Sequence, residues 1–217
     1  MAPNQALNEK QQSMIPIAAF TASGDLEKLK TALREGLAAG LTVNEIKEIL
    51  VHLYAYAGFP RSLNAISTFM AVLDERQAQG IEDEIGPEAS PLPADMNEDE
   101  FGVRVRARLA GWETIPPPGG YQLFTPIIDT FLKEHLFADI FARDILDFQS
   151  RELATISALA NMTGTGGQLF FHLGAAMNTG LSEAQMKDFI AVLESRVGGK
   201  VAESANQLLS TVLSSRA

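Results

Sequence analysis

The sequence predicts an all-α protein built from two similar helical units. Apolar residues recur three and four positions apart through most of the chain, and no segment alternates polar and apolar residues as a half-buried strand does. The ten residues that begin at Leu41 recur in degenerate form from Leu181, which is 181 − 41 = 140 positions later. The same offset relates further residues of the two halves, namely Gly40 and Gly180, Leu29 and Leu169, Leu33 and Leu173, and Gly58 and Gly198. Any difference between two such copies points to the chemistry of the protein.

The first unit, residues 1–80, is expected to hold four helices. They cover Leu7 to Ala22, Leu26 to Gly40, the residues that follow Thr42, and Leu63 to Gln79. Gly40 is a typical C-terminal stop, and Thr42 with Glu45 three positions later forms a capping box that opens the third helix. The run Gly58-Phe59-Pro60 breaks the pattern before the fourth helix. These signals predict amphipathic helices joined by short turns.

The connector, residues 81–123, loses the helical period and is rich in proline and acidic residues. We expect a short helix within Glu98 to Leu109 and an extended or turning loop from Pro116 to Gly120, because proline fixes φ and lacks a donor. A loop of this length is either a solvated linker or a functional segment that wraps a partner. The second unit, residues 124–217, regains helical spacing and repeats the capping box at Ser182.

The composition excludes several classes of function. The formal net charge is −10 and the chain has no run of lysine and arginine, so no nucleic-acid partner is expected. No apolar run approaches the roughly 18 residues of a membrane span, so no membrane insertion is expected. No signal peptide is visible, which favours a cytoplasmic protein, although a removed signal would leave no trace. The absence of cysteine excludes disulfides, thiolate metal sites and thiol catalysis.

The histidines distinguish the two copies. His172 stands where the first copy has Ala32, and Glu152 on the preceding helix is its candidate partner. Burial favours a neutral histidine and a carboxylate partner opposes that shift, so such a pair can exchange protons near neutrality. The alternative is a core histidine with Glu152 in a surface ion pair. His52 follows Glu48 by four positions, which is not the Glu-x-x-His spacing of di-iron bundles, so no metal is expected.

Two segments of the second unit resemble the carboxymuconolactone decarboxylase family. They are Leu146-Asp-Phe-Gln-Ser-Arg-Glu-Leu-Ala-Thr-Ile-Ser-Ala-Leu-Ala and Leu169-Phe-Phe-His-Leu-Gly-Ala-Ala-Met-Asn-Thr-Gly-Leu-Ser. The first unit agrees from Gly36 to the turn that ends at Pro60. The resemblance implies an alkyl hydroperoxidase D-like helical bundle that assembles into homotrimers or hexamers, with sites at subunit or repeat interfaces.

One branch of this family consists of thiol peroxidases. Their Cys-x-x-Cys lies seven and four residues before the family histidine, where this chain has Thr165 and Gln168. Attack on a peroxide by this mechanism needs a thiolate. The thiol peroxidase mechanism is therefore excluded.

The other branch removes carbon dioxide from 4-carboxymuconolactone, an intermediate of aromatic catabolism, and gives an enol-lactone. The reaction needs stabilisation of a developing enolate and a proton donor, with no metal or other cofactor. The resemblance implies that His172 is the proton donor and that Glu152 orients it. Arg151 is a candidate for binding a substrate carboxylate, and the alternative for Arg151 is a structural ion pair. His52 and Tyr56 are further substrate-binding candidates from the first unit.

Each unit has kept a different part of the family's polar residues. A single composite site, made from the end of the first unit and His172 of the second, would explain this division, as would decay of both sites. We therefore expect a cofactor-independent carbon–carbon lyase acting on a small carboxylated lactone. Two alternatives stay open: a non-catalytic or scaffolding oligomer with the same fold, and a lactone hydrolase or isomerase acting on another small molecule.

Overall fold

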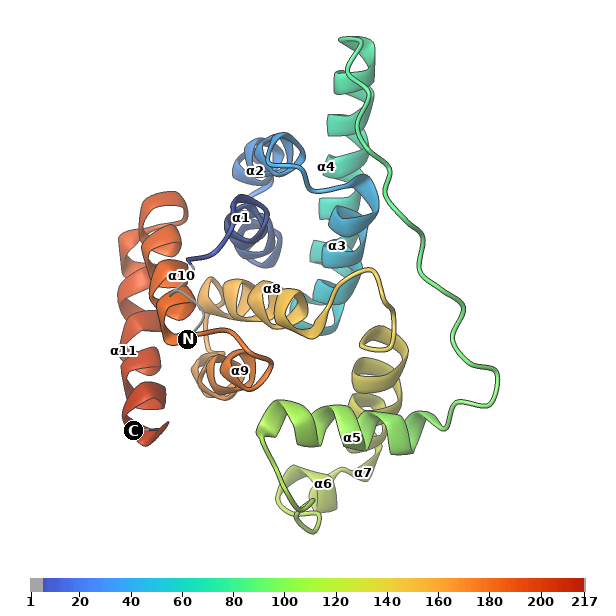
Figure 1. Ribbon diagram of the computed structural model, residues 1–217, viewed down its shortest axis with the longest axis vertical. Helices are drawn as coiled ribbons and strands as arrows, with labels where there is room; N and C mark the ends of the chain where they lie inside the picture. The colour runs from blue at the N-terminus through green and yellow to red at the C-terminus, as the bar shows by residue number, and fades with distance from the viewer. Residues whose placement is uncertain (1–5, 217) are drawn as a thin grey trace.

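The structure is a computed structural model that describes residues 6–216. Over these residues the chain is all-α, as predicted, and has no strand. The first repeat consists of α1 (Glu9–Ser23), α2 (Leu26–Ala38), α3 (Val43–Ala57) and α4 (Phe59–Ala78). The second consists of α8 (Phe148–Ala160), α9 (Gly166–Asn178), α10 (Glu183–Arg196) and α11 (Gly199–Arg216). Between them lie α5 (Glu98–Ala110), α6 (Tyr121–Phe124), α7 (Pro126–Thr130) and the π-helix η1 (Phe131–Ile140) (Figure 1).

The helices of the two repeats correspond one to one. Leu26 and Gly166, the first residues of α2 and α9, lie 166 − 26 = 140 positions apart, and the same offset relates α3 to α10 and α4 to α11. The starts of α1 and α8 differ by 148 − 9 = 139 positions. Capping boxes at Thr42 and Ser182 open α3 and α10, as their sequences predict. The tandem repeat is therefore confirmed.

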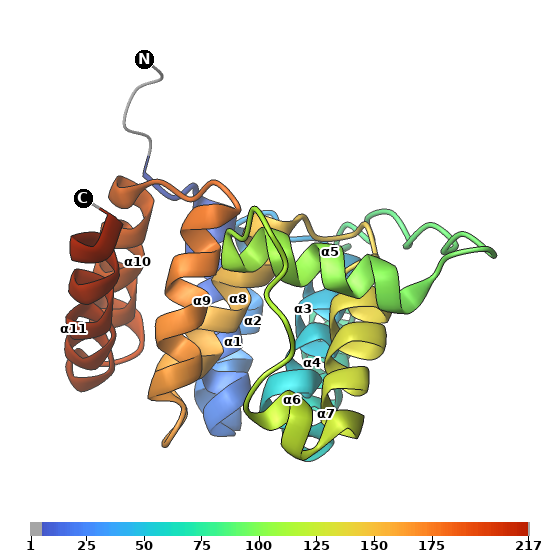
Figure 2. The same ribbon diagram turned by 90° about the horizontal axis from the view of Figure 1, so that it is seen from below.

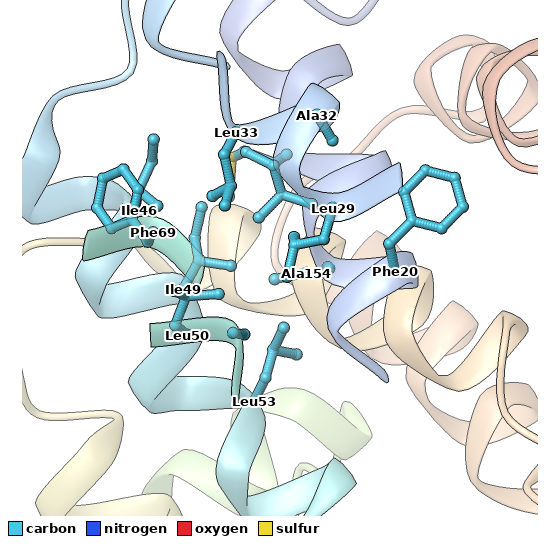
Figure 3. Packing of buried hydrophobic residues seen from close by; sticks show 14 of the residues in the cluster. Phe20, Leu29, Ala32, Leu33, Ile46, Ile49, Leu50, Leu53, Phe69 and Ala154 are labelled. Atoms are coloured by element: carbon cyan, nitrogen blue, oxygen red, sulfur yellow. The ribbon is translucent and has the colours of Figure 1, made fainter. Parts of the chain in front are cut away.

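Helices α1 and α8 pack against each other near the centre of the molecule (Figure 1). The apolar core of the first repeat includes Ala154 and Ala158 of α8, and the core of the second includes Ile15 of α1. Figure 3 shows Ala154 facing the leucines and isoleucines of α2 and α3. The first helix of each repeat thus contributes side chains to the core of the other repeat. Since burial of one leucine or isoleucine side chain stabilises the folded chain by about 1.5–3 kcal/mol, the stability of each repeat depends on the other.

The fourth helix begins earlier than the sequence predicts. It starts at Phe59 rather than at Leu63, and Pro60 lies within its first turn. Proline is favoured there because its fixed φ suits a helix and its missing N–H would have had no helical partner. Gly58 makes the sharp turn from α3 with a φ of 84°, so the predicted break is only one residue long.

We refer to residues 98–141, which contain α5, α6, α7 and η1, as the cap. The helix expected within Glu98 to Leu109 is confirmed as α5, and Pro116 to Gly119 form no helix. Helix α5 packs against η1 and α9, as Figure 2 shows, around a third apolar cluster: Val105, Leu109, Leu136, Phe137, Ile140, Phe141 and Ala175. The α5 segment of the connector is therefore packed against the second repeat and is not a solvated linker.

Charged side chains join the pieces of the cap. Asp129 of α7 accepts hydrogen bonds from Nη1 of Arg106 at 2.6 Å and from Nε2 of Gln122 at 3.0 Å. Burial alone would raise the pKa of Asp129, but these hydrogen bonds and nearby positive charges hold the pKa of Asp129 below its ordinary value. Lys133 of η1 pairs with Asp99 of α5. Helix α5 is thus joined by ion pairs to α7 and to η1.

Within residues 6–216, no helix is both long enough and apolar enough to cross a membrane.

Replacing Gly102 with alanine is expected to destabilise the cap. A Cβ at this position would collide with the backbone carbonyl of Lys133, so α5 and η1 would have to separate. Overpacking of this kind costs about 1–3 kcal/mol. We expect Gly102→Ala to lower the denaturant midpoint accordingly. The matched control is Gly119→Ala in the same segment, where an added Cβ meets no atom within 4 Å. Equal midpoints for the two variants would contradict this packing.

Candidate functional site

A cluster of buried polar side chains lies where α3, α8 and α9 meet. It contains Glu48 and His52 of α3, Arg151, Glu152 and Thr155 of α8, and His172 of α9, all of them buried. Burying charged groups is costly unless they are paired and hydrogen-bonded. Such a cluster with one edge on a pocket is a candidate active site.

His172 and Glu152 form the pair that reaches the pocket. Nδ1 of His172 lies 2.8 Å from Oε2 of Glu152, which is fully buried. With Nδ1 engaged in this bond, Nε2 is the ring nitrogen left to reach a ligand. His172 is 6% exposed and lines the pocket described below. The pair therefore has the arrangement of an oriented acid–base group.

Glu48 is the anchor of a second network. Its carboxylate accepts from Nη2 of Arg151 at 2.7 Å and from Nε and Nη2 of Arg143 at 3.0 and 2.9 Å. Burial would raise the pKa of Glu48, but the hydrogen bonds from both arginines outweigh it and hold this pKa below its ordinary value. Glu48 is therefore charged at neutral pH. Sequence reasoning missed Arg143, because it lies in the loop after η1, outside any helical pattern or repeated segment.

His52 belongs to this network and not to the pocket. Nη1 of Arg151 donates to its Nδ1 at 3.4 Å, and its Nε2 donates to Oγ1 of Thr155 at 2.8 Å. The pKa of His52 is far below its ordinary value, first because of burial and then because of the charges on Arg151 and His172. His52 is thus neutral and fully buried, and its contacts suit a residue that positions its neighbours rather than one that binds substrate.

Tyr56 connects the two networks. Its ring lies edge-on to His172, with centroids 5.5 Å apart, and tilted against His52 at 5.2 Å. Burial, followed by the negative charge of Glu152, raises the pKa of Tyr56. Its hydroxyl therefore keeps its proton and remains a neutral donor beside His172.

Arg151 is placed differently from what the sequence suggested. The residue is fully buried, and its Nη2 also donates to the backbone carbonyl of Arg143 at 2.7 Å. It does not line the pocket. This burial argues against a direct contact between Arg151 and a substrate carboxylate, and assigns Arg151 to holding Glu48 and His52.

A pocket of about 530 Å³ lies between α9 and the cap. Its walls include His172 and Phe171 of α9 and Arg106, Trp112, Tyr121 and Phe137 of the cap. This volume falls in the range of about 300–1,000 Å³ that is typical of small-ligand sites. Sequence reasoning missed the cap residues because the connector carries no motif and no period that would point them toward His172.

The first repeat has no pair equivalent to His172 and Glu152. At offsets of 140 and 139 positions, Ala32 replaces His172 and Ser13 replaces Glu152. Gln12, the counterpart of Arg151, lies 3.5 Å from Asp188, the counterpart of Glu48. The structure thus brings Glu48, His52 and Tyr56 of one repeat together with the acid–base pair of the other, in one composite cluster.

The remaining histidine lies apart from this cluster. His135 is on η1, half exposed, with Nδ1 2.8 Å from Asp139. Among residues 6–216 there is no group of three or more histidine, aspartate or glutamate side chains that could hold a metal ion.

The fold and the site together define an all-α, tandem-repeat protein with one buried histidine–carboxylate pair at the junction of its repeats. The sequence pattern of the carboxymuconolactone decarboxylase family matches residues 1–69 and 128–211, and the chain belongs to this family. The chain is also 27% identical over 70 residues to the uncharacterized protein MJ1511 of Methanocaldococcus jannaschii. That match covers 32% of this chain and 65% of the relative, which is less than two thirds of its length.

The Glu48 network predicts a pH-dependent stability. Because the pKa of Glu48 is lower in the folded than in the unfolded chain, its contribution is present at neutral pH and is lost as the pH falls below about 4.5. Glu48→Gln leaves two arginines without their carboxylate, which costs about 3 kcal/mol at neutral pH. We expect the difference in the free energy of unfolding between wild type and this variant to shrink in acid.

Denaturant unfolding at a series of pH values measures this difference. Glu183→Gln is the control, because Glu183 forms an exposed pair with Lys187 on one helix. A difference between wild type and Glu48→Gln that stays constant through the acid range would rule out the charged Glu48 as its source.

Proposed function

We propose that this chain is a cofactor-independent decarboxylase of small carboxylated lactones of the 4-carboxymuconolactone type, with His172 as the proton donor. The observation that carries the proposal is the 2.8 Å hydrogen bond between buried Glu152 and a histidine that borders the pocket. Membership of the family supports the reaction class, while the substrate itself is part of the proposal.

The chemistry requires one bond to break and one proton to move. When the bond between the ring carbon and its carboxylate breaks, carbon dioxide leaves and the electron pair passes into the conjugated lactone as an enolate. Protonated His172 then donates the Nε2 proton to carbon, which gives the enol-lactone. Glu152 holds the ring by Nδ1 and stabilises the imidazolium before transfer. A proton from solvent restores His172 for the next turnover.

The surroundings of His172 favour both halves of this reaction. Leu132, Phe137 and Phe171 line the pocket, and an apolar wall disfavours a carboxylate relative to neutral carbon dioxide. Tyr56 does not line the pocket, but its neutral ring packs edge-on against His172 and helps to hold the imidazole in place. Arg151 and His52 act one step further away, by fixing the helices that carry these groups.

We include a homo-oligomer, a trimer or hexamer, in the proposal. Exposed apolar side chains gather on α6, α7 and the start of η1: Leu123, Phe124, Ile127, Ile128 and Phe131. Phe124 alone is 90% exposed. A patch of neighbouring apolar side chains of this kind marks a protein–protein contact more often than it marks free surface.

Replacing His172 with glutamine is expected to abolish decarboxylation. The purified protein is assayed with 4-carboxymuconolactone by ultraviolet absorbance and by release of carbon dioxide. Loss of a general acid lowers the rate by about 100-fold or more, and Glu152→Gln should give a smaller loss because the proton donor remains. The control is His135→Gln, which changes an exposed histidine outside the pocket. A His172→Gln variant that keeps its turnover but unfolds more easily would identify His172 as a core residue. Absence of turnover by the folded wild type would contradict the proposal.

Replacing Phe124 with aspartate is expected to lower the mass of the assembly. The substitution places a charge at the centre of the exposed apolar patch and disfavours its burial against another copy. Light scattering coupled to size-exclusion chromatography measures the mass. Gln207→Glu, on the exposed face of α11, is the control and should leave the mass unchanged. A wild-type protein that elutes as a monomer would contradict the assembly.

A further inference from the structure

We propose that Arg106 of the cap binds a carboxylate of the substrate that the reaction does not remove, and that the cap therefore determines which organic acids enter the site. This inference rests on the proposed function only in taking the pocket beside His172 as the substrate site. The ligand class is a compact, unsaturated ring that carries at least this one carboxylate.

The pocket is lined by a cationic side chain and, within residues 6–216, by no acidic one. Arg106 and His172 both line it, and none of the described residues on its walls is an aspartate or a glutamate. This is unusual for a chain whose formal net charge is −10. Asp129 and Glu152 pair with these two side chains but do not line the pocket, so its described wall presents hydrogen-bond donors and no carboxylate, which favours an anionic ligand.

The geometry of Arg106 carries the second step. Its Nη1 donates to Asp129 at 2.6 Å, which fixes the direction of the side chain. Within residues 6–216, its Nε and Nη2 donate to no other group. These two nitrogens form the edge of a guanidinium that binds a carboxylate through paired hydrogen bonds. Asp129 also accepts from Gln122 and has Lys133 nearby at 3.9 Å, so it does not depend on Arg106 alone.

The shape of the pocket carries the third step. Trp112, Tyr121, Phe137 and Phe171 give it aromatic walls, and Gln122 and Gln168 add two amides. Flat aromatic surfaces favour a flat ring with delocalised electrons over a flexible chain of the same size. A carboxylate held by Arg106 is stabilised as an anion, so the carboxylate that leaves must occupy the apolar part of the pocket instead.

The place of these residues in the sequence carries the fourth step. Arg106, Trp112, Tyr121 and Gln122 all lie between residues 69 and 128, the stretch that the family pattern does not match. His172 and Glu152 lie inside the matched regions. The acid–base pair therefore comes from the regions that the family pattern matches, whereas the proposed carboxylate-binding residue Arg106 comes from the stretch that the pattern does not match.

The test uses the intrinsic fluorescence of Trp112, which is the only tryptophan of the chain and lines the pocket. The full-length protein is titrated with 2-furoate, a small unsaturated ring carboxylate, and separately with its neutral amide, 2-furamide. We expect saturable binding of 2-furoate and binding of 2-furamide that is weaker by about tenfold or more, since charge-assisted hydrogen bonds are the stronger kind.

Variants of Arg106 and its neighbours distinguish binding of the ligand carboxylate by Arg106 from a purely structural role of Arg106 in the cap. Arg106→Gln should weaken 2-furoate binding about tenfold and leave 2-furamide unchanged, and Arg106→Lys should fall between because it keeps the charge but not the paired donors. Arg104→Gln, on the exposed face of the same helix, is the matched control. Asp129→Asn removes the charge of Asp129 but keeps an oxygen that can accept from Arg106, so the side chain stays oriented and 2-furoate binding should be retained.

The outcomes distinguish this inference from the decarboxylase proposal. Equal affinity for 2-furoate and 2-furamide, no saturable binding, or equal losses in Arg106→Gln and Asp129→Asn would overturn the role of Arg106. If 2-furoate binding depends on Arg106 but 4-carboxymuconolactone is not turned over, the carboxylate site stands and the proposed reaction fails. If turnover depends on His172 but its KM is unchanged in Arg106→Gln, the reaction stands and this inference fails.

Discussion

The structure depends on a positive charge buried at its centre. Arg151 is fully buried on α8, and the carboxylate that pairs with it, Glu48, comes from α3 of the other repeat. Two charges removed from water repay their desolvation only when the geometry is good and their remaining hydrogen bonds are made. The contacts of Arg151 with His52 and with the carbonyl of Arg143 supply most of those hydrogen bonds, although its buried Nε has no partner within residues 6–216. The contacts of Arg151 therefore fix α3 of the first repeat, α8 of the second repeat and the loop that contains Arg143 relative to one another.

This fixed point supports the rest of the site. Arg151 and Glu152 are consecutive on α8, so the helix that presents one network also presents the other. Because the ion pair with Glu48 of α3 fixes the position of Arg151, the neighbouring Glu152 is also fixed beside α9, where it hydrogen-bonds to His172. Tyr56, two turns after Glu48 on α3 at about 3.6 residues per turn, then reaches the same histidine. The position of the first repeat that is equivalent to His172 is Ala32, which belongs to the apolar core, so the histidine–carboxylate pair is present in the second repeat and not in the first.

Much of the fold could be predicted from the sequence, but less of the site. The period of apolar residues and the capping boxes at Thr42 and Ser182 are local signals, and the tandem helices that they predict are present in the structure. Comparison of the two copies singles out His172, and Glu152 is its candidate partner because it lies on the preceding helix and matches the family's Arg-Glu-Leu segment. Arg143 and Arg106 could not be predicted in this way, because each acts through a long side chain from a segment without a repeat or a motif. The early start of α4 has a different reason: Pro60 is predicted to break the helix, but proline is favoured in the first turn of a helix, where it lies here.

The central claim is that an enolate is formed and protonated inside the site by a histidine held in one orientation. Turnover of 4-carboxymuconolactone in deuterium oxide, with nuclear magnetic resonance of the product, measures this most directly. A fixed donor delivers its proton to one face of the carbon, so we expect one deuterium in a single configuration. A product deuterated equally on both faces would show that the enolate is protonated in free solution, and would contradict the account.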